Sequence, residues 1–302
     1  MIQTVLGPIA PEELGVTMCH EHLSVNLSGV RGDPDSVFTD SPLIRDEVMQ
    51  AKKAGVNSFI EVSCNDMGRD PLALQALSKA CGIHIVCATG FYLDCYHPDW
   101  VRNGSISDIE ALFVRDLTQG IGDTGIKAGV IGEVAGEETC ITDSERKVLT
   151  AAARAGASCG CAVTTHCQLG RMGLEQSALL RENGMAPKKI VLGHLDLAND
   201  MDYYKAVLDT GVNIGFDTCG KIAYLADEVR ADNLCRLLEL GYGDQIMLSQ
   251  DISRKSYLTA GGKFGYLAVM DRMVPLLRER GVDQATLDRL LITNPARVFD
   301  IA

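Results

Sequence analysis

Four of the six histidines in this chain lie where short apolar stretches end. They are His20, His22, His166 and His194. His20 and His22 are two residues apart, so on a strand both imidazoles project from the same face. Two adjacent imidazoles suit a divalent transition metal, although the pair alone is equally compatible with ordinary buried histidines. The other two histidines break the pattern, because His84 begins an apolar stretch and His97 lies beside Pro98.

Two carboxylates occupy the same kind of position. Glu133 lies within an apolar stretch, and Asp251 ends another. Taken singly, Glu133 fits a buried ion-pair partner and Asp251 fits a helix N-cap. Together with four imidazoles, however, they form a set whose burial is costly without a compensating cation, and metal ions supply that compensation. The joint pattern of six residues therefore predicts a metal site.

The elements that must position these residues alternate regularly along the chain. Eight short apolar stretches lack strict polar–apolar alternation, which is typical of strands buried on both faces. They are Gly15–Leu23, Ser58–Cys64, His84–Phe91, Ala128–Ala135, Ala162–His166, Ile190–Asp196, Val212–Asp217 and Ile246–Asp251. Helical spacing of apolar residues lies between or after them. It covers Ser144–Ala155, Gly173–Glu182, Met201–Leu208, Val229–Leu240, Tyr266–Arg280 and a terminal helix around Asn294–Asp300.

Eight strand–helix alternations predict an α/β fold, a (β/α)8 TIM barrel that forms a single domain over residues 1–302. A doubly wound open sheet is the alternative, but the glycine-rich phosphate turn that usually follows its first strand is missing. Glycines such as Gly82 close the helices. We expect Asp143 to cap one helix and the Gly/Asp/Pro-rich segment Gly29–Ser41 to form a long loop.

Composition narrows the class of protein. The net charge of −12 disfavours binding to nucleic acid. No stretch reaches the roughly 18 apolar residues of a membrane span, and the N-terminus lacks the features of a signal peptide, so we expect a soluble cytoplasmic protein with no membrane partner. The 11 cysteines are odd in number and scattered, which favours buried thiols in a reducing compartment over a disulfide framework.

The polar residues lie in segments that resemble those of one known family. The segments are Thr17–Leu23, Gly90–Tyr92, His97–Pro98, Lys127–Val134, Thr164–His166, Met172–Gln176, Leu192–Asp196, Phe216–Thr218, Leu248–Asp251 and Asn294–Pro295. In this order they resemble the phosphotriesterase-like family of the amidohydrolase superfamily. That resemblance covers essentially the whole chain and implies a (β/α)8 barrel, and it also suggests a homodimer.

The same resemblance implies two divalent metal ions, usually zinc, although Mn, Co or Ni also suit such ligands. By position, His20, His22 and Asp251 would hold the more buried ion, and His166 and His194 the more exposed one. Glu133 would bridge both ions together with a hydroxide. Many members of the family use a carboxylated lysine as this bridge. Lys127 lies too early in the strand to serve, so the chain resembles the minority of members that use glutamate.

Candidate substrate-binding residues follow the last two strands. Lys221 follows the seventh strand, and Arg254 and Tyr257 follow the eighth. Loops at these places often bind phosphate in barrels, and a guanidinium, an ammonium and a phenol together suit an anionic group. Tyr92, in the motif after the third strand, completes the set. The alternative is that these cations pair with acidic residues of the chain, namely Asp217, Asp227 or Glu228.

These residues predict a binuclear-metal hydrolase in which a metal-bridging hydroxide attacks a small molecule and Asp251 accepts its proton. The expected substrate is a lactone or carboxylic ester that carries a phosphate or carboxylate. Hydrolysis of an N-acyl amide, or weak hydrolysis of organophosphate triesters, is the alternative. A metal-binding barrel without activity is an alternative of another class. An oxidoreductase would need a cofactor fingerprint that the sequence lacks.

Overall fold

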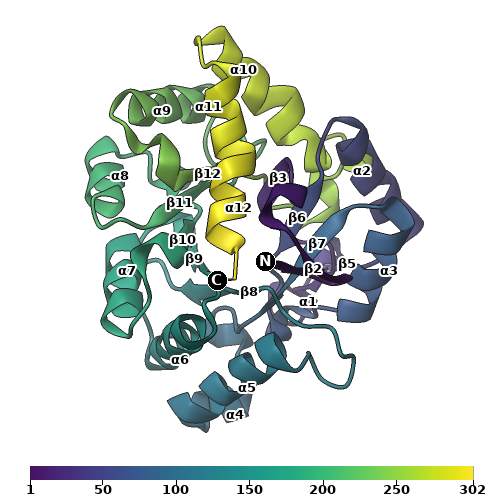
Figure 1. The fold of residues 1–302 in the computed structure, drawn as a ribbon, viewed down its shortest axis with the longest axis vertical. Coiled ribbons are helices and arrows are strands. Elements are labelled where there is room, and N and C mark those ends of the chain that lie inside the picture. The colour runs from purple at the N-terminus through teal and green to yellow at the C-terminus, as the bar shows by residue number, and fades with distance from the viewer. Residues whose placement is uncertain (302) are drawn as a thin grey trace.

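The computed structural model describes residues 1–301, and eight parallel strands form its central sheet. The strands pair in chain order, so each lies beside its neighbours in sequence (Figure 1). They are β3 (Thr17–Glu21), β6 (Ser58–Glu61), β7 (His84–Thr89), β8 (Val130–Gly136), β9 (Val163–Cys167), β10 (Ile190–Gly193), β11 (Asn213–Phe216) and β12 (Ile246–Leu248). Each coincides with one of the eight predicted stretches, although β8 and β9 end one residue later than predicted, and the predicted α/β barrel is confirmed.

The first and last strands come together at the seam of this nearly closed barrel. The Ser249 hydroxyl oxygen, directly after β12, accepts from the His20 backbone N–H at 3.1 Å and lies 2.9 Å from the His20 carbonyl oxygen. This side chain therefore links the end of β12 to β3.

Helices surround the sheet on its outer face (Figure 1). In chain order the longer ones are α2 (Pro42–Lys53), α3 (Pro71–Cys81), α5 (Ile106–Thr118), α6 (Asp143–Cys159), α7 (Gly173–Glu182), α8 (Met201–Leu208) and α9 (Asp227–Glu239). The shorter ones are α1 (Ser28–Arg31), α4 (Asp99–Asn103), α10 (Val274–Glu279), α11 (Gln284–Asp288) and α12 (Asn294–Phe299). Their buried aliphatic side chains pack on the strands and form the core between helices and sheet.

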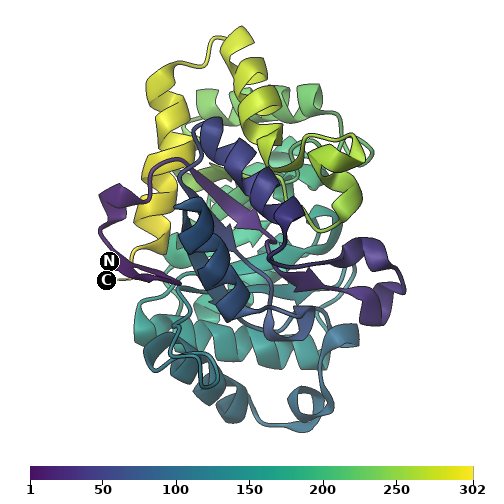
Figure 2. The same ribbon diagram turned by 90° about the vertical axis from the view of Figure 1, so that its right-hand side faces the viewer.

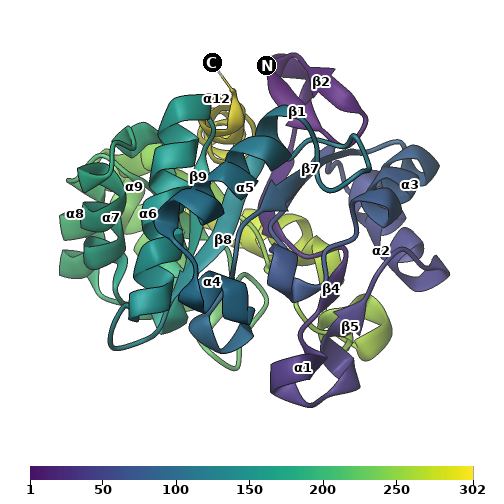
Figure 3. The same cartoon turned by 90° about the horizontal axis from the view of Figure 1, so that it is seen from below.

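The two ends of the barrel are covered differently. The hairpin of β1 (Ile2–Thr4) and β2 (Gly7–Ile9) lies near α12 and both chain ends (Figures 2 and 3). The opposite end carries α1 and a second hairpin, β4 (Val25–Asn26) with β5 (Val37–Phe38). Because these elements follow β3 directly, they mark the end at which the strands terminate.

Three local expectations need correction. The segment Gly29–Ser41 is not a plain loop, because it contains most of α1 and one strand of the second hairpin. The cap of α6 is Thr142, whose hydroxyl accepts from the Glu145 N–H in a capping box, and Asp143 is the first helical residue. The predicted helix Tyr266–Arg280 begins as a wide π-helical turn before α10. In residues 1–301 no helix has the length and apolar character that a membrane crossing requires.

We predict that Gly132→Ala unfolds far more easily than the parent chain. Gly132 has φ +119°, and a Cβ there would lie 2.0 Å from the Thr164 carbonyl oxygen in the neighbouring strand. Neither backbone can move without disturbing β8 and β9, so we expect a loss of at least about 3 kcal/mol in unfolding free energy. Gly29→Ala is the matched control, since its Cβ meets open space. Equal denaturation midpoints for the two variants would contradict the prediction that a Cβ at position 132 destabilises the barrel.

Candidate functional site

The structure gathers all six predicted metal ligands at the end of the barrel where the strands terminate. His20 and Glu133 lie within β3 and β8, and His166 lies within β9. His194 directly follows β10, whereas Asp251 comes three residues after the end of β12. All six side chains are buried. Residues on or shortly after β3, β8, β9, β10 and β12 thus converge on one small volume.

Glu133 is at the centre of this group. Its Oε2 lies 3.1 Å from His20 Nε2, 3.0 Å from His166 Nδ1 and 3.3 Å from His194 Nε2. Its Oε1 lies 3.4 Å from His22 Nε2. The two oxygens of one carboxylate therefore face imidazoles from four places in the chain, which is the arrangement required of a bridging ligand.

Asp251 also contacts this group of histidines, through His22. Its Oδ1 is 3.1 Å from His22 Nε2, and its Oδ2 accepts from the Lys221 ammonium. Asp251 has φ +49°, a left-handed conformation that is uncommon for a non-glycine residue. The backbone turn directs its carboxylate toward the imidazoles and away from the helix that follows, so the N-cap alternative does not hold.

Burial and charge act against each other throughout this cluster. Burial disfavours the imidazolium of His22, but the carboxylates of Asp251 and Glu133 outweigh it and raise the pKa of His22 to about 10. Burial likewise opposes ionisation of Glu133, yet the charges of His166 and His20 hold the pKa of this carboxyl well below its ordinary value. The site therefore favours ionised carboxylates surrounded by positive charge.

The donor set fits divalent metal ions. Two clusters, His20–His22–Glu133 and Glu133–His166–His194, each place their ligand atoms within 4.8 Å of one another. His166 Nδ1 and His194 Nε2 approach to 2.9 Å, and both also face a Glu133 oxygen. Imidazole nitrogens and a carboxylate that converge in a buried volume need a shared cation, and imidazole with carboxylate suits ions such as zinc. The shared Glu133 makes the pair of clusters consistent with a binuclear site.

Two residues that the sequence analysis did not assign contact the Nδ1 atoms of the imidazoles, on the side away from Glu133. Asp217 Oδ1 accepts from His194 Nδ1 at 2.9 Å, and its Oδ2 lies 3.4 Å from His20 Nδ1. The Ser63 hydroxyl lies 2.9 Å from His22 Nδ1. A third group, His20–His194–Asp217, also satisfies the distances of a metal site. We interpret Asp217 as an orienting carboxylate instead, because the Nε2 atoms of both histidines face Glu133.

Glu21, between the two histidines of the motif, supports the other side of the site. Its Oε1 accepts from the Ser249 hydroxyl at 2.6 Å and from the Gln250 N–H at 2.9 Å. Its two oxygens also accept from the backbone N–H groups of Asp251 at 3.2 Å and Ile252 at 3.0 Å. Because side chains alternate along a strand, the histidines face the site while Glu21 holds the backbone that carries Asp251.

A cavity of about 260 Å³ opens over this group. All four predicted substrate-binding residues line it, namely Tyr92, Lys221, Arg254 and Tyr257. The Tyr92 hydroxyl lies 3.4 Å from both ring nitrogens of His166. Asp66 accepts from the Tyr92 N–H, and His97 Nε2 lies 2.9 Å from the Tyr92 carbonyl oxygen. His97 thus belongs to the scaffold of the cavity wall.

The two predicted cations, Lys221 and Arg254, do pair with acidic residues, but not with the acids named in the alternative. Lys221 pairs with Asp251, and Arg254 pairs with Asp33 at 3.0 Å and lies 3.8 Å from Asp35. Neither contacts Asp217, Asp227 or Glu228, the three acids named as alternatives.

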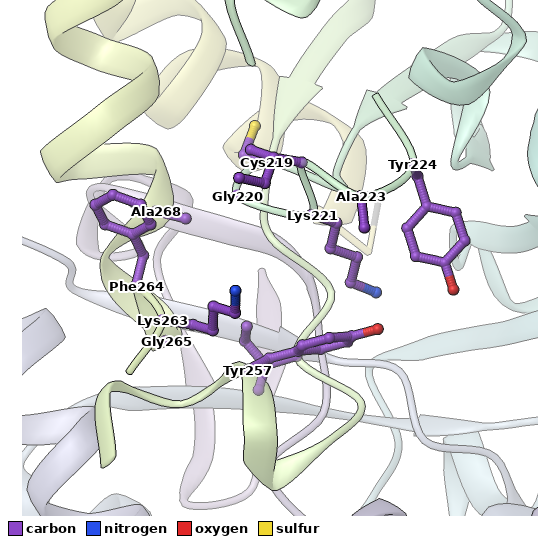
Figure 4. A pocket seen from close by; sticks show the side chains of 12 residues that line it. Cys219, Gly220, Lys221, Ala223, Tyr224, Tyr257, Lys263, Phe264, Gly265 and Ala268 are labelled. Atoms are coloured by element: carbon purple, nitrogen blue, oxygen red, sulfur yellow. The ribbon is translucent and has the colours of Figure 1, made fainter. Parts of the chain in front are cut away.

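A smaller and mostly apolar pocket of about 70 Å³ adjoins the first cavity. The two share Lys221, Tyr224 and Tyr257, and Phe264 and Ala268 line the far side (Figure 4). The Lys221 ammonium lies 5.2 Å from the centre of the Tyr257 ring, a cation–π distance. Lys221 and Tyr257 together therefore separate a polar chamber from an apolar one.

We predict that Asp217→Asn weakens metal binding by about 10- to 100-fold without unfolding the protein, because an amide orients the two histidines less firmly than a carboxylate does. Retained metal is measured by elemental analysis after dialysis against graded chelator. Asp202→Asn is the control, since the Asp202 side chain is 94% exposed and pairs with Lys205, not with a histidine of the site. Equal metal retention in the two variants would rule out the orienting role.

Comparison with known proteins agrees with this geometry. The sequence profile of the phosphotriesterase family matches residues 1–299. The phosphotriesterase homology protein of Escherichia coli is 36% identical, with 94% of this chain and 98% of that protein covered. Its crystal structure, with phosphate in the active site, superposes with a TM-score of 0.93 over 95% of this chain and 99% of that one.

Two further relatives carry named activities. The structure of a lactonase from Listeria monocytogenes is 28% identical and superposes with a TM-score of 0.94, covering 100% of this chain and 99% of the other. An N-acetyltaurine hydrolase of Tetraodon nigroviridis is 31% identical, with 97% of this chain and 96% of that protein covered. The barrel, the buried histidines around Glu133 and these matches lead to one conclusion: the chain belongs to the phosphotriesterase family of the amidohydrolase superfamily and is a metal-dependent hydrolase.

Proposed function

We propose that this enzyme hydrolyses a lactone or carboxylic ester that carries an anionic group. One observation carries the proposal: the cavity over the metal-binding clusters is lined by basic side chains and phenols from several loops. A neutral phosphotriester would favour apolar walls, and the apolar chamber here is the smaller of the two. The phosphate in the active site of the Escherichia coli relative supports an oxyanion-binding site, and the Listeria relative supports lactone chemistry.

Each predicted site residue has a proposed task. Two divalent ions held by His20, His22, His166, His194, Glu133 and Asp251 would supply activated water and polarise the substrate carbonyl. Asp251 Oδ1 faces the ligand cluster, so this carboxylate is placed to accept the proton of the attacking water and pass it to the leaving oxygen. The phenol of Tyr92 lies next to His166, where it is placed to orient the carbonyl. Lys221, Arg254 and Tyr257 form the wall that contacts the rest of the substrate.

The second candidate substrate is an anionic N-acyl amide. N-acetyltaurine, named for the Tetraodon relative, is an amide that ends in a sulfonate, so it presents an oxyanion to its enzyme just as a phosphorylated lactone would. The apolar pocket beside Lys221 offers a place for an acyl group. Amide and ester hydrolysis need the same attack on a carbonyl, and they differ in the leaving group that must be protonated.

We predict that Asp251→Asn lowers kcat by about 100-fold or more, because an amide cannot accept the proton. The substitution also leaves the Lys221 ammonium without its partner, which costs stability on its own. Asp251→Asn combined with Lys221→Met removes that unpaired charge and should stay equally inactive while it folds more stably. Metal content and circular dichroism are measured for both variants. Turnover at the parent rate with metals bound would exclude the proton-transfer role.

A substrate panel tests the class of substrate. The zinc-loaded enzyme is assayed with a phosphorylated sugar lactone, the same lactone without phosphate, N-acetyltaurine and a neutral N-acetyl amide. We expect kcat/KM to be at least about 10-fold higher for the anionic member of one pair, as a charge-assisted hydrogen bond provides. A difference in kcat/KM within the lactone pair would favour a lactone substrate, and a difference within the amide pair would favour an N-acyl amide. Equal kcat/KM within both pairs would contradict anion recognition.

A further inference from the structure

Three basic side chains line the polar cavity, and they differ in what they already bind. They are Arg31, Lys221 and Arg254. The charge of Lys221 is met by Asp251, and that of Arg254 is met by Asp33 and Asp35. A cation already paired with a carboxylate adds little net attraction for a substrate anion, because the anion must compete with the resident partner. Two of the three cations therefore have carboxylate partners in this structure.

Arg31 is the exception. It is the last residue of α1, on the segment that the sequence analysis treated as a plain loop. Among residues 1–301, no carboxylate oxygen comes within the 4.0 Å of an ion pair with its guanidinium. One of its terminal nitrogens donates to the Ser253 carbonyl oxygen at 3.4 Å, and the guanidinium also interacts with the neutral phenol of Tyr96. A guanidinium has five N–H donors, so these two contacts with uncharged groups leave donors for a ligand. Arg31 is partly buried, so this charge is not simply dispersed in water.

The charge of Arg31 lies at the wall of the polar cavity. It lines the same cavity as His22, Asp251 and Tyr92, and its charge acts to lower the pKa of the Tyr92 phenol against the larger effect of burial. The bond to Ser253 places it next to the loop that carries Arg254. A molecule whose carbonyl lies at the metal-binding clusters can therefore reach Arg31 with a second polar group.

We propose that Arg31 is the residue that binds the oxyanion of the substrate, whether phosphate, carboxylate or sulfonate. This inference rests on the proposed function and assigns its specificity to one residue outside the predicted set. A guanidinium presents a planar fork of N–H donors that matches two oxygens of such a group at once. Lys221 and Arg254 then act mainly through their ion pairs, which hold Asp251 and the loop containing Asp33 in place.

The test compares Arg31→Met with Arg31→Lys in the zinc-loaded enzyme. Methionine keeps much of the apolar stem and removes the charge, whereas lysine keeps the charge without the fork. Lys255→Met is the matched control, because Lys255 lies on the loop beside Arg254 yet does not line the cavity. Each variant is assayed with the phosphorylated and unphosphorylated forms of one lactone and with N-acetyltaurine, after its metal content and thermal unfolding have been checked.

We expect Arg31→Met to lower kcat/KM for the anionic substrate by about 10- to 100-fold, mostly through KM, because a charged hydrogen bond is lost. Activity on the uncharged lactone should stay within about twofold, since that substrate has no group for Arg31 to bind. Arg31→Lys should recover part of the loss, and Lys255→Met should match the parent enzyme. The anionic substrate whose KM responds identifies the oxyanion.

Two other results have distinct meanings. If the parent enzyme itself shows no preference for anionic substrates, the proposed function fails and the assignment of Arg31 fails with it. If the parent shows that preference and Arg31→Met retains it, the assignment of Arg31 alone is overturned. An equal fall of kcat/KM on charged and uncharged lactones would also overturn it, because it would show a structural role for the side chain.

Discussion

The buried carboxylate of Glu133 is the constraint on which the arrangement of the surrounding site depends. An ionised carboxylate in a barrel interior is costly unless positive charge surrounds it on short contacts. Here four imidazoles provide the surroundings, and two clusters that share Glu133 can each hold a cation. Close approach of β8 and β9 is needed to bring Glu133 against His166, and Gly132 permits it because any Cβ there would strike the Thr164 carbonyl. The local backbone thus follows from the need to place one carboxylate.

The seam of the barrel and the site depend on the same contacts. Ser249 joins β3 to the end of β12, and Glu21 accepts from Ser249 and from the backbone that follows. Glu21, the last residue of β3 and the neighbour of both His20 and His22, therefore supplies the carboxylate that fixes the turn bearing Asp251. Asp217 performs the equivalent task for His20 and His194. Rigid strands with a second layer of hydrogen bonds keep the ligands in place, which a metal site requires.

The sequence predicts the strands and the six proposed ligands because both produce patterns that can be recognised along the chain. Apolar stretches mark strands buried on two faces, and a polar residue at the end of such a stretch stands out. Asp217 obeys the same rule at the end of the seventh stretch and could have been assigned by it. Arg31 produces no such pattern, because its place in the cavity depends on how the chain folds between β4 and β5. The pairing of Lys221 with Asp251 likewise joins two loops that no spacing connects.

Chemistry and recognition occupy different parts of this molecule. The histidines and Glu133 lie on or directly after strands, where the backbone is fixed by its neighbours, whereas the residues that face a substrate lie on loops. Arg254–Asp33 and the bond from Arg31 to Ser253 tie these loops to each other. The Ile252 N–H and the Tyr92 hydroxyl also contact the strands, at Glu21 of β3 and His166 of β9. Residues that only tie one loop to another can therefore change while the site keeps its geometry. This division explains how one barrel serves relatives named as a lactonase and as an N-acetyltaurine hydrolase. If Arg31 binds the oxyanion, the choice of substrate depends on a residue at the end of α1 that has no carboxylate partner among residues 1–301.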